Sequence, residues 1–181
     1  MRTPEILTLL QNEISKNPYM SMHPLKKEDL VFEERVKINC FYCARYGTKW
    51  TCPPHIPSLD YKKIIMEYDH LLVVIYSRPF QMEDYDTVRT ESTNDLHRKL
   101  LDIESVLYCN NNSMAISFIG GSCKLCKNGC GKEKCNNPGK ARIPWEATGV
   151  NIIKTIENMD IGYDIQFPIR NTFYRYGLLL F

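Results

Sequence analysis

Four cysteines lie within thirteen residues of a glycine-rich segment, residues 120–139, and their type and spacing suit metal chemistry. The segment holds five of the nine glycines of the chain and has few apolar side chains with which to form a core. Thiolates that converge on a metal centre would hold such a segment in place, because the free energy of ligation is then also folding free energy. The cysteines follow the pattern Cys-x2-Cys-x3-Cys-x4-Cys and are Cys123, Cys126, Cys130 and Cys135.

This spacing is close, though not identical, to that of the short cysteine runs that bind iron–sulfur clusters, in which a proline follows the last ligand. Here that proline is Pro138. We therefore expect residues 120–139 to form a loop that binds a four-iron four-sulfur (4Fe–4S) cluster. Zinc is the alternative cofactor, because four-thiolate zinc sites are common. A third interpretation is that these four cysteines form disulfides or remain free thiols.

A separate group of three cysteines lies earlier in the chain, at about residues 40–57. In chain order this is the first cysteine group, and Cys123, Cys126, Cys130 and Cys135 form the second. Its Cys-x2-Cys pair can bind one metal or cluster from a single turn. Two prolines, Pro53 and Pro54, remove backbone donors and stiffen the chain after the last cysteine of the group. The metal ligands expected in this first loop are Cys40, Cys43 and Cys52.

The first group has only three local cysteines, so its fourth ligand is open. It could be Cys109, His55, a cysteine of the distant loop, or no protein group at all. A cluster with three cysteine ligands would leave one iron open to a substrate, as catalytic zinc sites keep one position open. In a zinc-based reading the two Cys-x2-Cys pairs share one ion, and the ligands are Cys40, Cys43, Cys123 and Cys126.

Positive charge follows the cysteines. The chain has a formal net charge of only +2, yet residues 35–59 contain four cations and no acid, and residues 123–142 contain six cations against one acid. Nearby cations would lower the pKa of the cysteines and stabilise an anionic cluster. A nucleic-acid partner does not explain why the charge follows the cysteines, so we do not expect one.

The sequence also indicates in which cellular compartment the protein is expected. The first residues do not read as a secretory signal, and no apolar run approaches the length of a membrane span. Eight cysteines in such a chain favour reduced thiols and metal ligation over a disulfide framework. We expect a cytoplasmic protein without a membrane partner.

The elements that must position the two loops follow from hydrophobic periodicity. Residues 1–181 should form a single domain, an α/β or α+β sandwich in which flanking helices pack on a central sheet. Both metal loops would follow strands and so be aimed from a rigid scaffold. Helices are expected at residues 4–16, 59–68 and 91–108 and around 150–156, and strands at residues 31–38, 71–76, 113–119, 161–167 and 171–181.

Two signatures in the sequence resemble those of an uncharacterised family of cysteine-rich predicted metal-binding proteins, found mainly in anaerobic prokaryotes. The first is Cys40-x2-Cys43-x2-Tyr46-Gly47-x2-Trp50-x-Cys52-Pro53-Pro54-x2-Pro57. The second is Gly121-x-Cys123-x2-Cys126 with Cys130, Cys135 and a downstream stretch at residues 142–151. The chain departs from the family pattern at Asn136, Asn151 and Ile143-Pro144-Trp145 and keeps every family cysteine. The resemblance implies metal binding and no established reaction.

The sequence thus predicts a redox protein in which an iron–sulfur cluster transfers electrons to or from a partner protein. The three-cysteine site would hold a second cluster, with catalysis at an open iron as an extension. The alternatives are a binding module stabilised by zinc and a carrier that delivers metal or cluster to another enzyme. Neither a substrate nor an oligomeric state can be read from the residues.

Overall fold

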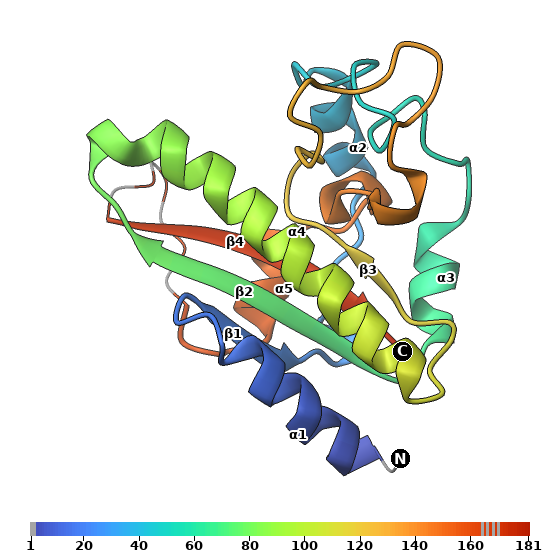
Figure 1. Ribbon diagram of the computed structural model, residues 1–181, viewed down its shortest axis with the longest axis vertical. Helices are drawn as coiled ribbons and strands as arrows, with labels where there is room; N and C mark the ends of the chain where they lie inside the picture. Colours follow the sequence, from blue (N-terminus) through green and yellow to red (C-terminus); the bar gives the residue numbers. More distant parts are fainter. Residues whose placement is uncertain (1–2, 164, 166, 168, 170) are drawn as a thin grey trace.

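The computed structural model describes residues 3–163, 165, 167, 169 and 171–181. One antiparallel sheet forms the centre, and helices pack on both of its faces (Figure 1). This is the single-domain α+β class expected from the sequence. In the part of the chain that the structure describes, no helix has the length and apolar character needed to cross a membrane.

The sheet has the strand order β1-β2-β4-β3. Its strands are β1 (Met20–Pro24), β2 (Leu71–Pro79), β3 (Ile116–Phe118) and β4 (Thr172–Leu180). The two long strands, β2 and β4, pair over their whole length, from Leu71 opposite Leu180 to Pro79 opposite Thr172. An uninterrupted apolar run such as residues 71–76 is typical of a strand that is covered on both faces, and both faces are covered here.

Helices α1 (Thr3–Ile14) and α4 (Tyr85–Cys109) cover one face (Figure 1). Four residues of α4 that share the 3.6-residue period, Leu96, Leu100, Ile103 and Leu107, are fully or almost fully buried there. They pack with Leu72, Val74 and Tyr76 of β2 and with Leu179 of β4. The long amphipathic helix predicted from the sequence is therefore confirmed, and it begins six residues earlier than expected.

Helices α3 (Tyr61–Glu67) and α5 (Ile152–Asn158) contribute to the core on the opposite face. Each begins at a polar residue, Asp60 or Asn151, whose side chain accepts a hydrogen bond from the backbone N–H three residues later. Trp145, which is completely buried, fills the centre of this core beside the odd-numbered residues of β2.

Two sequence predictions are wrong, and one strand was not predicted. Residues 34–41 form helix α2 (Glu34–Phe41) instead of the end of a strand at residues 31–38. Of the expected strand only an isolated bridge at Phe32 is observed. The described positions of the expected strand at residues 161–167 are not in a strand, while 164 and 166 lie outside the described residues. The strand that was not predicted is β1.

The physical reason for the error at α2 lies in its exposure. The alternation of apolar and charged residues there resembled a strand, but no strand lies beside it to pair with, and none of its residues is fully buried. Glu34 in the first turn favours a helix start through the helix dipole. The first cysteine group therefore follows a helix, whereas the second follows β3 as expected.

We predict that His97 of α4 makes stability depend on pH. Its side chain is completely buried, and Nε2 donates to the carbonyl oxygen of Lys140 at 2.8 Å. Nδ1 has no hydrogen-bond partner among the residues that the structure describes. Burial lowers the pKa of His97 from 6.5 to about 4. Because the unfolded state then takes up the proton first, stability should be full above pH 6.5 and fall by up to about 3 kcal/mol as pH decreases towards 4.

Urea unfolding at a series of pH values measures this dependence. His97→Gln keeps a donor for Lys140 and removes the titration, so the fall in stability between pH 6.5 and 4 should become shallower. His70→Gln, at a partly exposed histidine, is the matched control and should leave the slope unchanged. An identical slope in wild-type protein and His97→Gln would contradict the prediction.

Candidate metal centre

The loop that carries the second cysteine group is closed at its base. Ile119 donates from its backbone N–H to the carbonyl oxygen of Ile143 at 3.0 Å, and Trp145 donates to the carbonyl oxygen of Ile119 at 2.8 Å. Residues 120–142 therefore leave and rejoin the fold at one point, beside the end of β3. Because Trp145 is part of the core, the rigid scaffold fixes both ends of this loop.

Gly120 allows the loop to start against β4. A β-carbon at this position would lie 2.5 Å from the carbonyl oxygen of Tyr176 and 2.6 Å from Cδ of Arg175. Only glycine permits this close approach without a shift of the backbone. The side chain of Arg175 consequently lies across the beginning of the loop.

The end of the loop is attached to α4. His97 holds the carbonyl group of Lys140, as described above. Arg142 forms a largely buried ion pair with Glu104, to which it donates from Nε at 2.8 Å. Glu104 also accepts a hydrogen bond from Ser117 of β3 at 2.5 Å. Charged and polar contacts thus fix the loop where it has no apolar side chains to bury.

The structure brings the second cysteine group together. Its four members line one narrow cavity of about 20 Å³, together with Trp50 and residues at the base of the loop. Burial raises the pKa of Cys123, and the neighbouring thiols raise it further, while a backbone hydrogen bond from Leu125 opposes the shift. The four cysteines of this cavity are Cys123, Cys126, Cys130 and Cys135.

Two polar groups support this cavity. Asn137 donates from Nδ2 to the sulfur of Cys126 at 3.1 Å, a contact that would stabilise a thiolate. Lys124 lies in the wall, and its Nζ donates to the hydroxyl of Thr93 at 2.9 Å. Burial lowers the pKa of Lys124 to about 8, and the neighbouring cations Arg175, Arg89, Arg45 and Lys49 lower it further.

The first cysteine group also lies close together. Cys40 is in the last turn of α2, Cys43 is exposed one turn later, and Cys52 is 7% exposed. Burial raises the pKa of Cys52 to about 11, and the negative potential of the other two cysteines and of Glu146 adds to the shift. Burial likewise raises the pKa of Cys40, with smaller contributions from Glu146 and Cys43.

Two of the candidates for a fourth ligand in this group, Cys109 and His55, differ in their position. Cys109 is exposed at the C-terminal end of α4, which Figure 1 shows away from the two loops. His55 uses Nε2 to donate to the carbonyl oxygen of Gly47 at 3.2 Å, and its ring packs on Trp50 with centroids 4.6 Å apart. His55 contacts Cys52 through its backbone, since its N–H donates to the carbonyl oxygen of Cys52 at 3.0 Å, while its imidazole is engaged by Gly47 and Trp50.

Trp50 joins the two loops. Its indole Nε1 donates to the carbonyl oxygen of Gly131 at 2.8 Å, across 81 positions of sequence. The tryptophan belongs to the first loop, yet it lines the cavity of the second.

Glu146 is a functional candidate that sequence reasoning missed. It lies in the 3-10 helix η4 (Trp145–Thr148), its carboxylate accepts a long hydrogen bond from Gly121 at 3.4 Å, and it interacts electrostatically with Cys40 and Cys52. Burial raises its pKa, against the opposing effect of Arg175 and Lys124. The sequence feature that could have indicated Glu146 is its position in the second family-like signature, within residues 142–151.

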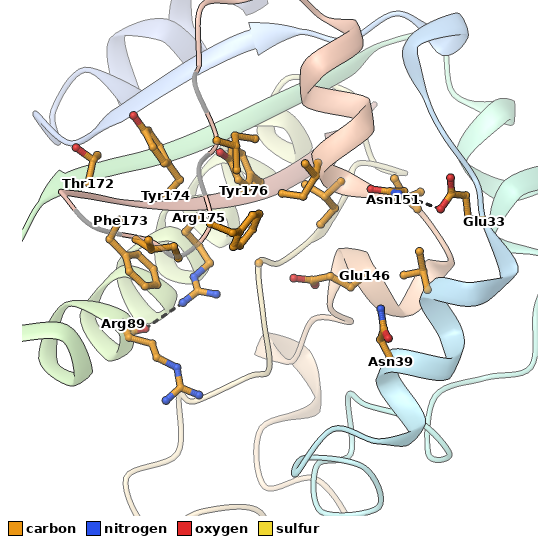
Figure 2. Close-up of a pocket in the computed structure, with 18 of the residues that line it drawn as sticks. Glu33, Asn39, Arg89, Glu146, Asn151, Thr172, Phe173, Tyr174, Arg175 and Tyr176 are labelled. Carbon is orange, nitrogen blue, oxygen red and sulfur yellow. Dashed lines mark hydrogen bonds between the residues drawn. The ribbon is translucent and has the colours of Figure 1, made fainter. Parts of the chain in front are cut away.

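Figure 2 shows Glu146 and Arg175 pointing into a much larger cavity of about 860 Å³. Gly120, at the start of the second loop, and Asn39, next to Cys40, also line it. The cavity therefore lies beside both cysteine-bearing segments. It was not anticipated from the sequence.

Within the described residues, no three histidine, cysteine, aspartate or glutamate side chains already form a group that could hold a metal ion. The seven cysteines are gathered into two groups, but their arrangement is not that of a finished coordination sphere. Their role as ligands therefore stays a prediction.

A comparison with protein families found one match, to a model described as "Predicted metal-binding protein (DUF2284)", over residues 23–181. The match includes both cysteine groups and all four strands except the first three residues of β1. No curated protein and no solved structure matches the chain.

We predict that Gly120→Ala destabilises the protein by about 1–3 kcal/mol, because the added methyl group would displace the backbone of β4 or the side chain of Arg175. Gly139→Ala is the matched control within the same loop, since no atom lies within 4 Å of the added carbon. Its effect should stay within about 0.5 kcal/mol. Denaturant unfolding of the three proteins measures the difference, and equal stabilities would show that the loop does not depend on this approach.

Proposed function

The chain belongs to this family of predicted metal-binding proteins, and from that premise we propose that it is an iron–sulfur protein that transfers electrons. Cys123, Cys126, Cys130 and Cys135 would hold a 4Fe–4S cluster in the second loop. Such a cluster supplies one-electron oxidation and reduction. The residues of the chain bind it, tune its charge and connect it to the scaffold.

One observation carries the proposal: four thiols from a segment with almost no apolar side chains line a single cavity. The ends of that segment are fixed by the scaffold, while its interior is attached by polar contacts such as Trp50 to Gly131 and Lys124 to Thr93. Metal ligation would supply the missing folding free energy. The hydrogen bond from Asn137 to the sulfur of Cys126 is of the type that tunes cluster potentials.

The charges around the cavity favour an anionic group. Burial raises the pKa of Cys123, so its thiol favours the protonated form until a cation replaces the proton. Lys124, buried in the wall among other cations, loses part of its unfavourable interaction when an anionic cluster is bound nearby. The cysteines and the cations of this loop thus complement one another.

Zinc is the second candidate for the same four thiolates, and the size of the cavity favours it. A volume of about 20 Å³ is enough for one water-sized particle, so a four-iron cluster requires the loop to widen. Gly129 and Gly139 have no atom within 4 Å of the position of a β-carbon, so the loop is loosely packed at these points. We propose iron–sulfur chemistry first because the ligand spacing resembles that of cluster-binding runs.

The proposal extends to the first cysteine group and to a partner. Cys40, Cys43 and Cys52 would hold a second metal centre with three protein ligands, which leaves a position for catalysis. The electrons would be exchanged with a redox partner protein. Exposed aromatic residues beside Cys40 and Cys43, namely Phe41, Tyr42 and Tyr46, pack edge-to-face and provide apolar surface of the kind found at interaction sites.

The test is metal and acid-labile sulfide analysis of protein purified without oxygen. Wild-type protein should contain iron and sulfide in equal amounts and absorb in the visible region. Cys126→Ala should lose about four irons and four sulfides per chain and become less stable, because one of four ligands is gone. Cys109→Ala, at an exposed cysteine outside both groups, should keep the wild-type content.

Three outcomes would count against the proposal. Full iron and sulfide content in Cys126→Ala would exclude this loop as the site. A single zinc ion without sulfide, lost in the same variant, would establish the second candidate. Equal losses in Cys126→Ala and Cys109→Ala would show that the assay reports general instability and not ligation.

A further inference from the structure

The large cavity lies where the sheet is incomplete. Strand β4 has nine residues, but only Leu178, Leu179 and Leu180 pair with β3. Beside the remaining part of β4, residues 172–176, lies a cavity of about 860 Å³ that α2, η4 and the start of α5 help to enclose (Figure 2). This volume is within the range typical of sites for small organic molecules.

The walls combine apolar surface with a few polar groups. Aliphatic and aromatic side chains from β4, α5 and the segment before β4 supply the apolar part, among them Val150, Ile152, Ile153, Phe173 and Tyr176. Arg175 and Glu146 point into the space from opposite sides, and Asn39 points into it from α2 (Figure 2). Such a combination would hold an apolar body and fix a polar end.

Arg175 is poorly satisfied by the protein. Its guanidinium lies over the ring of Phe173, 4.8 Å from the centroid, and donates one long hydrogen bond to the carbonyl oxygen of Arg89 at 3.3 Å. Its Nε is buried and has no hydrogen-bond partner among the described residues. A guanidinium has five donors in a planar fork, so most of its capacity is available for a carboxylate.

The charges around Arg175 favour an anion. Arg89 and Lys124 interact with it electrostatically, and both are cationic. Arg89 forms an ion pair with Asp86 at 3.6 Å, and because this pair is exposed, water screens it. Glu146 faces Arg175 and attracts it electrostatically, but burial disfavours the charged form of this carboxyl and raises its pKa.

The other acid in the lining is already neutralised. Glu33 forms ion pairs with Arg35 at 2.5 Å and with Lys154 at 2.7 Å, and it accepts a hydrogen bond from Asn151 at 2.9 Å. These contacts lower its pKa to about 2. The α2 end of the cavity is therefore balanced, while the Arg175 end has an excess of positive charge.

We propose that this cavity binds a small organic anion, a carboxylate on an aromatic or aliphatic body, with the carboxylate against the Arg175 guanidinium. The body would lie against Phe173, Tyr176 and the aliphatic residues of α5. The proposal goes beyond the electron-transfer function and does not depend on whether the cysteines bind metal. Glu146 and Asn39 place the bound anion beside the first cysteine group.

Isothermal titration calorimetry with 2-naphthoate and its neutral analogue 2-naphthamide tests this on the full chain as purified. The two probes share one body and differ in charge. The naphthoate should bind at least about ten-fold more tightly than the amide, because only the anion pairs with Arg175. Its affinity should fall as salt increases.

Three variants separate the cavity from the rest of the surface. Arg175→Gln should weaken naphthoate binding by about ten-fold or more and leave naphthamide unchanged. Arg98→Gln, at an exposed arginine of the same helix as Arg89, is the control and should bind as wild type. Because Arg175 packs on Gly120 and its loss could unfold the loop, Ile153→Trp provides a second route: it fills the cavity, keeps the arginine and should abolish binding of both probes.

Equal affinity for the two probes would overturn the proposal, as would no binding of 2-naphthoate at millimolar concentration. Wild-type affinity in both Arg175→Gln and Ile153→Trp would show binding elsewhere on the surface. The outcome is independent of the metal assay, because Cys126→Ala should bind 2-naphthoate as wild type does. Failure here would therefore leave the iron–sulfur proposal intact, and the reverse is also true.

Discussion

The short pairing between β3 and β4 is the constraint on which the rest of this structure depends. Over residues 178–180, β4 is an interior strand that pairs on both sides and is buried on both faces. Each large apolar side chain buried there contributes roughly 1.5–3 kcal/mol of hydrophobic stabilisation. Beyond Gly177 the neighbouring strand is absent, and the chain that would have continued β3 turns away at Gly120 to form the cysteine-rich loop. One strand thus belongs to the core at one end and to the candidate site at the other.

The turn at Gly120 explains how a loop with little apolar surface is held. Its two ends are hydrogen-bonded to each other at Ile119 and to the core through Trp145. Its final residues are attached to α4 through His97 and through the ion pair of Arg142 with Glu104. These contacts fix where the loop starts and ends. These contacts do not fix the middle of the loop, where the four thiols lie. In our proposal, metal ligation by the thiols stabilises this middle part.

The same geometry places unlike chemical groups side by side. Arg175 lies across the glycines at the start of the loop, and Glu146 lies opposite, between the first cysteine group and the large cavity. Burial acts on each of them in the direction that disfavours charge, raising the pKa of Glu146 and lowering that of Arg175. The large cavity and the first cysteine group are therefore neighbours, and Glu146 lines the cavity and interacts electrostatically with Cys40 and Cys52.

Local patterns in the sequence were sufficient to predict α4, β2 and β4 and to identify the two cysteine groups. Helical and strand periodicity depends on residues a few positions apart, and the spacing of ligands in a tight loop does too. The alternation before Cys40 misled the prediction because periodicity does not indicate whether a neighbouring strand exists. Strand β1 was not predicted, because Met20–Pro24 is short, partly polar and ends in proline.

The larger cavity and the charged residues that line it could be identified only from the tertiary structure. Asn39, Glu146 and Arg175 come from three distant segments, and each by itself is an ordinary polar residue in the sequence. They meet because β3 is short and because α2 and η4 pack beside the free edge of β4. Burial, which sets their protonation and leaves the guanidinium of Arg175 short of partners, exists only once the layers have assembled. The sequence therefore determined which residues could bind a metal, and the packing of the sheet determined that a site for an organic anion lies next to them.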